Sequence, residues 1–166
     1  IQSNFIKGLR VTDKDTINIV ENVLIEFNKE IVEALKKLNC KAKKITTKEN
    51  SIISVIQEDQ DLGFVGIPRS INKDLLTETI KTNEVPVIAP LGLDKNNQTF
   101  NINADTAAGS IAIELKARRL MIISDVEGVL DSKKKLIPEI NSKKANELID
   151  QDIITGGMIR KIKNCL

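Results

Sequence analysis

The chain has 166 residues, a length that suits one domain or a large part of one. Its apolar fraction of 41% can form a core, which must be aliphatic because the sequence holds four Phe and no Trp or Tyr. The 25 basic and 23 acidic residues nearly balance, whereas a nucleic-acid-binding domain usually carries a marked basic excess. No apolar run reaches the ~18 residues that a membrane span needs. We therefore expect a globular protein without a nucleic-acid or membrane partner.

Histidine is absent from the sequence, which excludes Ser-His and Cys-His nucleophiles and His metal ligands from these residues. Cys40 and Cys165 form no CxxC unit, so we expect two reduced thiols and no metal site. The chain begins with Ile1, and its last segment still has a helical pattern at Leu166. We expect residues 1–166 to be a single domain that is incomplete at both ends.

The first predicted element is a long helix. Thr12 and Asp15 have the spacing of a capping box. Apolar residues then recur in steps of three and four from Ile17 to Leu38, and Asn39 ends the pattern. The runs that follow predict short strands at residues 42–46, 51–56 and 64–67, a helix at 75–81 with Asn72 as its cap, and a buried strand at 85–90.

A polar loop at residues 94–98 leads into Asn101-Ile-Asn-Ala-Asp105, and a helix with unusually small side chains is predicted over 106–118. Residues 120–123 form a continuous apolar run, which is typical of a parallel strand buried on both faces. The remaining predicted elements are a hairpin at 129–137, a helix capped by Ser142 and a final helix that begins near Thr155.

This alternation of helices with buried strands predicts an α/β fold with a mainly parallel sheet. In such sheets, ligands bind beyond the carboxyl ends of the strands. Two polar groups are predicted there: residues 101–105, before a helix, and Ser124-Asp125, after an apolar strand. Each alone also has a local explanation, because Asn-rich turns and Asp caps are common.

Four motifs occur in a fixed order: Gly8-Leu-Arg-Val-Thr-Asp13, Asn101-Ile-Asn-Ala-Asp105-Thr-Ala-Ala-Gly109, Ser124-Asp-Val-Glu-Gly-Val-Leu-Asp131 and Ile154-Thr-Gly-Gly-Met-Ile-Arg-Lys161. Together they resemble the acetylglutamate kinase family of the amino-acid kinase superfamily, over essentially the whole chain. The middle two motifs are shared by the superfamily, whereas the first points to the acetylglutamate branch.

The resemblance implies a role for each matching residue. Arg10 would grip a carboxylate of N-acetyl-L-glutamate, a task that suits a planar, bidentate donor, and Asn101 would hold the same substrate. Asp105 would orient the active-site lysines. Lys161 would contact the nucleotide phosphates and the charge that develops during transfer.

The family implies ATP with Mg²⁺ as a substrate complex, and neither a tightly bound cofactor nor a protein metal site. Ser124, Asp125, Gly156 and Gly157 lie, with Lys161, where the family binds the nucleotide. The implied fold is a three-layer α/β/α sandwich, assembled as a homodimer or a dimer-based hexamer. The implied reaction is the second step of arginine biosynthesis, in the bacterial cytoplasm or a plastid.

The implied chemistry needs no general base, because the attacking carboxylate is already an anion. However, the family's N-terminal Lys with its glycine pair and its second Gly-rich loop are not in this sequence, so we expect these residues alone to be inactive. Two alternatives stay open. One is a sibling kinase for a carrier-bound aminoadipate in lysine biosynthesis, and the other is a non-catalytic ligand-binding relative.

Overall fold

The computed structural model describes residues 4–6 and 9–165, so Gly8 of the first motif lies outside the described residues. The helices are α1 (Lys14–Lys37), α2 (Lys73–Lys81), α3 (Ala104–Glu114), α4 (Ser142–Asp150), α5 (Gly157–Lys163) and the 3₁₀ turn η1 (Gln60–Leu62). The strands are β1 (Phe5–Ile6), β2 (Leu9–Arg10), β3 (Ala42–Ile45), β4 (Ile53–Gln57), β5 (Gly66–Ile71), β6 (Val85–Ile88), β7 (Leu91–Leu93) and β8 (Thr99–Asn101). No described helix has the length and apolarity to cross a membrane.

Helix α1 begins one residue later than the capping box predicted. Asp13 is its N-cap, and the Asp13 side chain accepts a hydrogen bond from the Thr16 N–H at 2.7 Å. Thr12 is buried instead, and its hydroxyl donates to the Arg10 carbonyl at 3.1 Å. The polar core face of α1 includes Asn28, whose amide donates to the Val87 carbonyl at 2.8 Å and so ties the helix to β6.

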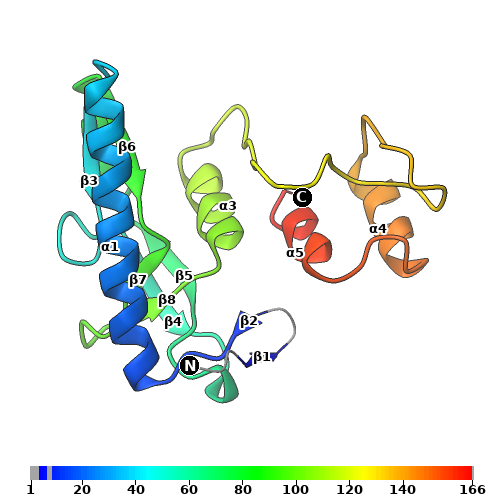
Figure 1. Cartoon of the computed structure of the whole chain (residues 1–166), viewed down its shortest axis with the longest axis horizontal. Helices are drawn as coiled ribbons and strands as arrows, with labels where there is room; N and C mark the ends of the chain where they lie inside the picture. The colour runs from blue at the N-terminus through cyan, green and yellow to red at the C-terminus, as the bar shows by residue number, and fades with distance from the viewer. Residues whose placement is uncertain (1–3, 7–8, 166) are drawn as a thin grey trace.

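The strands pair in both directions. β3 and β6 are parallel, and the four-stranded sheet has the order β5-β4-β7-β8, in which β4 and β7 are parallel and the other pairs are antiparallel. The antiparallel pairs arise because short loops, including the predicted polar loop 94–98, can join only antiparallel neighbours. The α/β class is confirmed, and in Figure 1 the strands lie between α1 and α3.

The larger core is mostly aliphatic, as the composition predicted, and Phe100 is its one aromatic member among the buried residues named here. Its buried members come from the strands, from α2 and from the start of α3: Ile45, Ile52, Ile53, Val55, Leu76, Phe100, Ile102 and Ala107. We call residues 9–115, which contain this core, the main body.

Residues 120–123 contradict the prediction of a buried strand. The segment is not a strand, and Met121 and Ile123 are 80% and 93% exposed. A parallel strand stays buried only between neighbouring strands and under helices on both faces, and no described strand pairs with this segment. Residues 116–128, the connecting segment, instead run without helix or strand from α3 toward the C-terminal helices (Figure 1).

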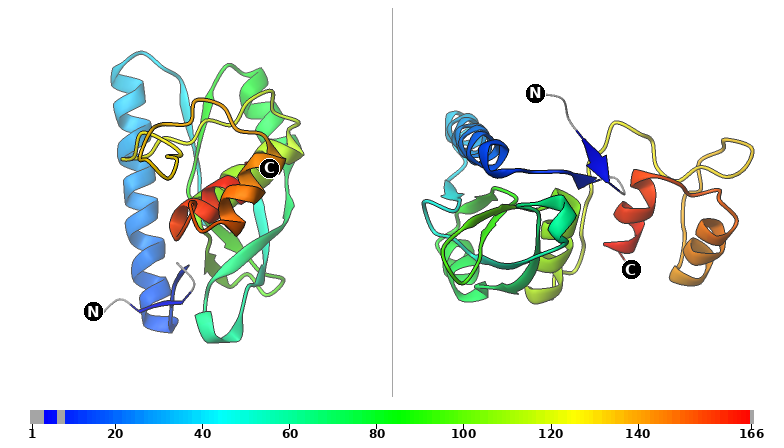
Figure 2. Two further views of the ribbon diagram at one scale, coloured as in Figure 1. Left: turned by 90° about the vertical axis from the view of Figure 1, so that its right-hand side faces the viewer. Right: turned by 90° about the horizontal axis from the view of Figure 1, so that it is seen from below.

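Residues 129–165, which we call the C-terminal unit, have a smaller core of their own, built around Ala145, Leu148, Ile154 and Ile162. The predicted hairpin is confirmed by the bridge between Leu130 and Leu136. The N-cap of α4 is Asn141 rather than the predicted Ser142, because the Asn141 side chain accepts from the Lys144 N–H at 2.9 Å. The right-hand view in Figure 2 shows α5 between the main body and α4.

The four longer helices share one kind of ending. Each is followed by a non-glycine residue in the left-handed conformation, with φ between 49° and 60°: Asn39, Asn83, Lys116 and Asp152. In each case the N–H of the next residue reaches back five positions, as the Cys40 N–H does to the Leu35 carbonyl and the Ala117 N–H to the Ala112 carbonyl. These are Schellman motifs, in which glycine is the usual left-handed residue.

Candidate functional site

Two motifs that lie far apart in the sequence meet in one ion pair. Lys161 Nζ on α5 lies 2.9 Å from Asp105 Oδ2 on α3, and both side chains are partly buried. Burial from water strengthens such a charge-assisted contact. The structure therefore joins the main body to the C-terminal unit through the two residues that the sequence singled out as catalytic.

The start of α3 holds Asp105 in place. Asn103 caps the helix, because its side-chain oxygen accepts from the Thr106 N–H at 3.1 Å. Asp105 then lies in the first turn, where the helix dipole favours a negative charge. The local sequence thus stabilises a carboxylate at the point where α5 approaches.

Small side chains let α5 come close to α3. A Cβ atom on Gly109 would lie 2.9 Å from the Asn164 carbonyl oxygen, a distance that real Cβ atoms do not tolerate. Next to it, the Asn164 amide donates to the Thr106 hydroxyl at 3.2 Å. Of the small residues predicted in the sequence, Gly109 therefore faces α5, whereas Ala107 is buried in the larger core.

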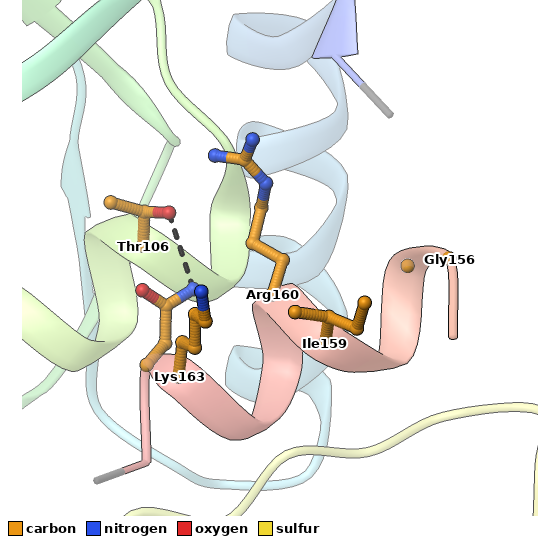
Figure 3. Close-up of a pocket in the computed structure, with 7 residues that line it drawn as sticks. Thr106, Gly156, Ile159, Arg160 and Lys163 are labelled. Carbon is orange, nitrogen blue, oxygen red and sulfur yellow. Dashed lines mark hydrogen bonds between the residues drawn. The ribbon is translucent and has the colours of Figure 1, made fainter. Parts of the chain in front are cut away.

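A cavity of about 640 Å³ opens beside this contact, and its lining comes from α3, α5 and the loop before α5 (Figure 3). Gly156 and Gly157, both predicted for the nucleotide, line it. The other lining residues were not predicted: Thr106, Ile159, Arg160, Lys163 and Asn164. Gly156 adopts a left-handed φ of 57°, which explains glycine at the entry to α5.

The two predicted substrate residues lie on separate strands. Asn101 is half-buried at the end of β8, where its backbone N–H donates to the Phe64 carbonyl at 2.9 Å, and it is three residues from the N-terminus of α3. Arg10 is exposed on β2, with its guanidinium 5.3 Å from the centre of the Phe5 ring, a cation–π contact.

The predicted nucleotide residues Ser124 and Asp125 lie in the exposed connecting segment. The Ser124 hydroxyl donates to Asp125 Oδ1 at 3.3 Å, and neither residue is among the described residues that line the cavity. They lie there because residues 120–123 do not form the predicted strand, which would have placed Ser124 and Asp125 at the edge of a sheet. Within the described ranges, no three His, Cys, Asp or Glu side chains are grouped so that they could hold a metal ion.

Cationic side chains give the cavity its electrostatic character. Arg160, Lys161 and Lys163 lie within four positions of α5, and two of them meet carboxylates of the main body: Lys161 meets Asp105, and Arg160 Nη1 lies 3.5 Å from Glu58 Oε1. The remaining positive charge near the cavity can attract an anion such as a phosphate.

A glycine-lined, cationic cavity beside a lysine–carboxylate contact is suited to binding an anionic group such as a phosphate. The sequence pattern described as "Amino acid kinase family" matches residues 1–166, and the chain belongs to this family.

Individual relatives are more specific. The chain is 83% identical to the "Acetylglutamate kinase" of Pelagibacter ubique (strain HTCC1062), over the whole chain and 58% of that protein. It is 44% identical to the acetylglutamate kinase of Rhodospirillum centenum (strain ATCC 51521 / SW), over the whole chain and 59% of that protein. The chain therefore spans a little under three-fifths of the length of these two relatives.

Solved structures agree with the fold. The structure of smu.665 from Streptococcus mutans UA159 superposes with a TM-score of 0.92 at 32% identity, over 99% of this chain and 67% of that one. An N-acetylglutamate synthase from Neisseria gonorrhoeae, complexed with coenzyme A and N-acetyl-glutamate, superposes with a TM-score of 0.87 at 18% identity, over 98% of this chain and 38% of that one. The second likeness bears on the fold alone.

Proposed function

We propose that a protein of the relatives' full length containing residues 1–166 transfers the γ-phosphate of ATP to the side-chain carboxylate of N-acetyl-L-glutamate, in the second step of arginine biosynthesis. The observation that carries this proposal is the 2.9 Å contact between Lys161 and Asp105 beside the cationic cavity. The 83% identity to an acetylglutamate kinase supports the choice of substrate.

The chemistry is electrostatic. The attacking carboxylate and the ATP phosphates repel each other, so the site must supply positive charge and hold the two reactants in line. In this proposal Lys161 supplies an ammonium next to the residues that line the cavity, and Asp105 fixes its direction. In this proposal Arg10 and Asn101 hold N-acetyl-L-glutamate, while Mg-ATP enters as the second substrate.

We further propose that Ser124, Asp125, Gly156 and Gly157 contact the nucleotide. Gly156 and Gly157 already line the cavity. Ser124 and Asp125 can join them only if the connecting segment lies differently in the full-length protein, which would also bury the exposed apolar run at residues 120–123.

The proposed assembly is a homodimer, alone or within a hexamer. Its support is an apolar stripe on the exposed side of α1, formed by Ile19, Val23 and Phe27, which are 48%, 60% and 56% exposed. A spacing of four places these side chains on one helix face. A self-complementary helix face is the usual basis of a two-fold dimer. The proposed location is the bacterial cytoplasm, with a plastid as the alternative, and the bacterial relatives named above support a bacterial source.

The decisive experiment measures ADP release by the full-length protein with Mg-ATP and one of four acceptors: N-acetyl-L-glutamate, glutamate, aspartate or a carrier-bound aminoadipate. We expect turnover with N-acetyl-L-glutamate alone, reduced at least about a hundredfold in Lys161→Ala. Arg10→Ala should raise the KM for N-acetyl-L-glutamate more than that for ATP. Turnover with the aminoadipate would identify the sibling kinase instead, and ATP binding without turnover would identify a ligand-binding relative.

A further inference from the structure

The C-terminal unit is joined to the main body chiefly by polar contacts of α5. The apolar side chains of α5, including Met158 and Ile162, pack into the small core of the C-terminal unit. Three polar side chains reach the main body instead: Arg160, Lys161 and Asn164. The position of Lys161 against Asp105 therefore depends on these few contacts.

One of these contacts has no counterpart among the predicted site residues. Arg160 Nη1 lies 3.5 Å from Glu58 Oε1, across 102 sequence positions, and the two side chains are 30% and 23% exposed. Glu58 directly follows β4, and its backbone N–H donates to the Val65 carbonyl at 2.8 Å. Its carboxylate is thus mounted on a fixed strand end, and Arg160 extends away from α5 in Figure 3.

We propose that Arg160 is a positioning residue, which acts through Glu58 to fix the rotation of α5 and so holds Lys161 in place against Asp105. Lys161 and Asn164 both attach α5 to α3, and a helix held by only one neighbouring element can pivot about it. Arg160 and Lys161 are neighbours on α5 but are attached to different elements, the end of β4 and the start of α3. Two such attachment points remove the pivot, in the way that supporting contacts keep a reactive group within reach of its target.

The same pair also balances charge. Arg160, Lys161 and Lys163 would repel one another on a seven-residue helix, and the Glu58 carboxylate offsets one of the three charges. The expected effect of the Arg160–Glu58 pair on catalysis rests on the function proposed above. Its effect on the ordering of α5 does not depend on that function.

The test is a charge swap in the full-length protein, measured as ADP release from Mg-ATP with N-acetyl-L-glutamate. We expect Arg160→Glu and Glu58→Arg each to lower kcat about tenfold, while the KM for ATP changes less than about threefold. The double variant, in which the two charges are exchanged, should recover kcat to within about threefold of the wild type. Recovery by exchange requires that the two side chains act on each other.

A matched control is Lys73→Glu. Lys73 and Glu114 also form a 3.5 Å ion pair, but it is more exposed, at 57% and 41%, and neither residue lines the cavity. We expect kcat to stay unchanged in this variant. The rival interpretation, that Arg160 contacts ATP directly, predicts a higher KM for ATP in Arg160→Glu and no recovery in the double variant. That result would overturn the positioning role.

Hydrogen exchange of the α5 amides, followed by mass spectrometry, tests the inference even if the wild type shows no turnover. Both single variants should exchange faster over residues 157–163 than the wild type, and the double variant should return to the slower rate. Equal exchange in all four proteins would refute the proposal. Absence of turnover together with the expected exchange pattern would refute only the proposed function.

Discussion

Glu21 is a carboxylate within the core, only 8% exposed, on the inner side of α1. It accepts hydrogen bonds from the hydroxyls of Thr47 at 2.6 Å and Thr99 at 2.7 Å, and Lys48 Nζ lies 3.4 Å away. Burial acts to raise the pKa of Glu21, but the two hydroxyl groups and the charge of Lys48 together outweigh it. The net pKa is therefore below the ordinary value of 4.5.

A lowered pKa makes this network depend on pH. The ionised Glu21 stabilises the fold above the unfolded pKa near 4.5, and this stabilisation is lost as the pH falls through the lower pKa of the folded state. We expect Glu21→Gln to lower the free energy of unfolding by about 1–3 kcal/mol at neutral pH. The difference from the wild type should shrink as the solution is acidified.

Urea unfolding at a series of pH values measures this effect. Glu26→Gln is the matched control, because Glu26 pairs with Lys29 at 3.1 Å on the exposed side of the same helix, where an ion pair contributes about 0.2–1 kcal/mol. A constant difference between wild type and Glu21→Gln at all pH values would show that the charge of Glu21 does not stabilise the fold.

At this scale, the sequence and its family resemblance could single out Asp105 and Lys161 but not their contact geometry. Arg160 carried no such signal, because a charged residue on a helix is most often solvated. Its partner Glu58 is 102 positions away. Sequence spacing predicts contacts within one helix or strand pair, and it does not predict a contact between the main body and the C-terminal unit.

The helices and strands with a strong local pattern were predictable. The apolar residues spaced three and four apart correctly predicted α1, and Asn72 was correctly predicted as the N-cap of α2. β7 and β8 have three residues each, too few for a periodicity to show. The strand predicted at residues 120–123 was wrong for a different reason. An apolar run indicates only that the residues favour burial, and whether they are buried depends on neighbouring strands.

The close packing of α3 on α5 gives a prediction for Gly109. In Gly109→Ala the new methyl group would press on the Asn164 carbonyl oxygen at 2.9 Å, so α5 must move away from α3 and Lys161 must move from Asp105. We expect a loss of about 1–3 kcal/mol in unfolding free energy, as in other overpacked contacts, and a fall in kcat of the full-length protein.

Ala108→Gly is a suitable control for Gly109→Ala. It changes α3 at the neighbouring position without adding an atom, and it should cost about 1 kcal/mol through helix propensity alone. Urea unfolding and ADP release separate the two effects. If kcat falls equally in both variants, the close approach of α3 and α5 has no special importance for the site.

At the scale of the whole molecule, the apolar stripe on α1 gives a prediction about assembly. We expect Val23→Glu/Phe27→Glu to convert a dimer of the full-length protein into a monomer, because burying two unpaired carboxylates at an interface is strongly unfavourable. Size-exclusion chromatography with light scattering measures the mass. Leu38→Glu, an exposed apolar residue beyond the end of α1, is the control and should remain dimeric.

Residues 1–166 on their own should not turn over substrate. The described residues bring Lys161 to Asp105 but leave Ser124 and Asp125 outside the cavity lining. The family's other phosphate-binding loops are not in this sequence. We expect ADP release by these residues to equal that of their Lys161→Ala variant. Release above that control would show that the C-terminal unit and main body suffice for transfer.

The four Schellman endings have non-glycine residues at the position where glycine is usual. The chain uses Asn, Lys and Asp at positions where glycine would avoid the penalty of a left-handed side chain. Glycine codons are rich in G and C, whereas Asn and Lys codons are rich in A, so a gene rich in A and T would favour this choice. The penalty is largest at Lys116, because Asn and Asp tolerate the left-handed region better than Lys does.

Glycine at these helix ends should therefore make the protein more stable. Lys116→Gly should raise the free energy of unfolding by about 0.5–1 kcal/mol, and Asn39→Gly by less, as thermal melts of the two variants can compare. An equal gain at both positions would mean that side-chain identity is unimportant at these endings. The expected order would show that the left-handed conformation costs more folding free energy at Lys116 than at Asn39.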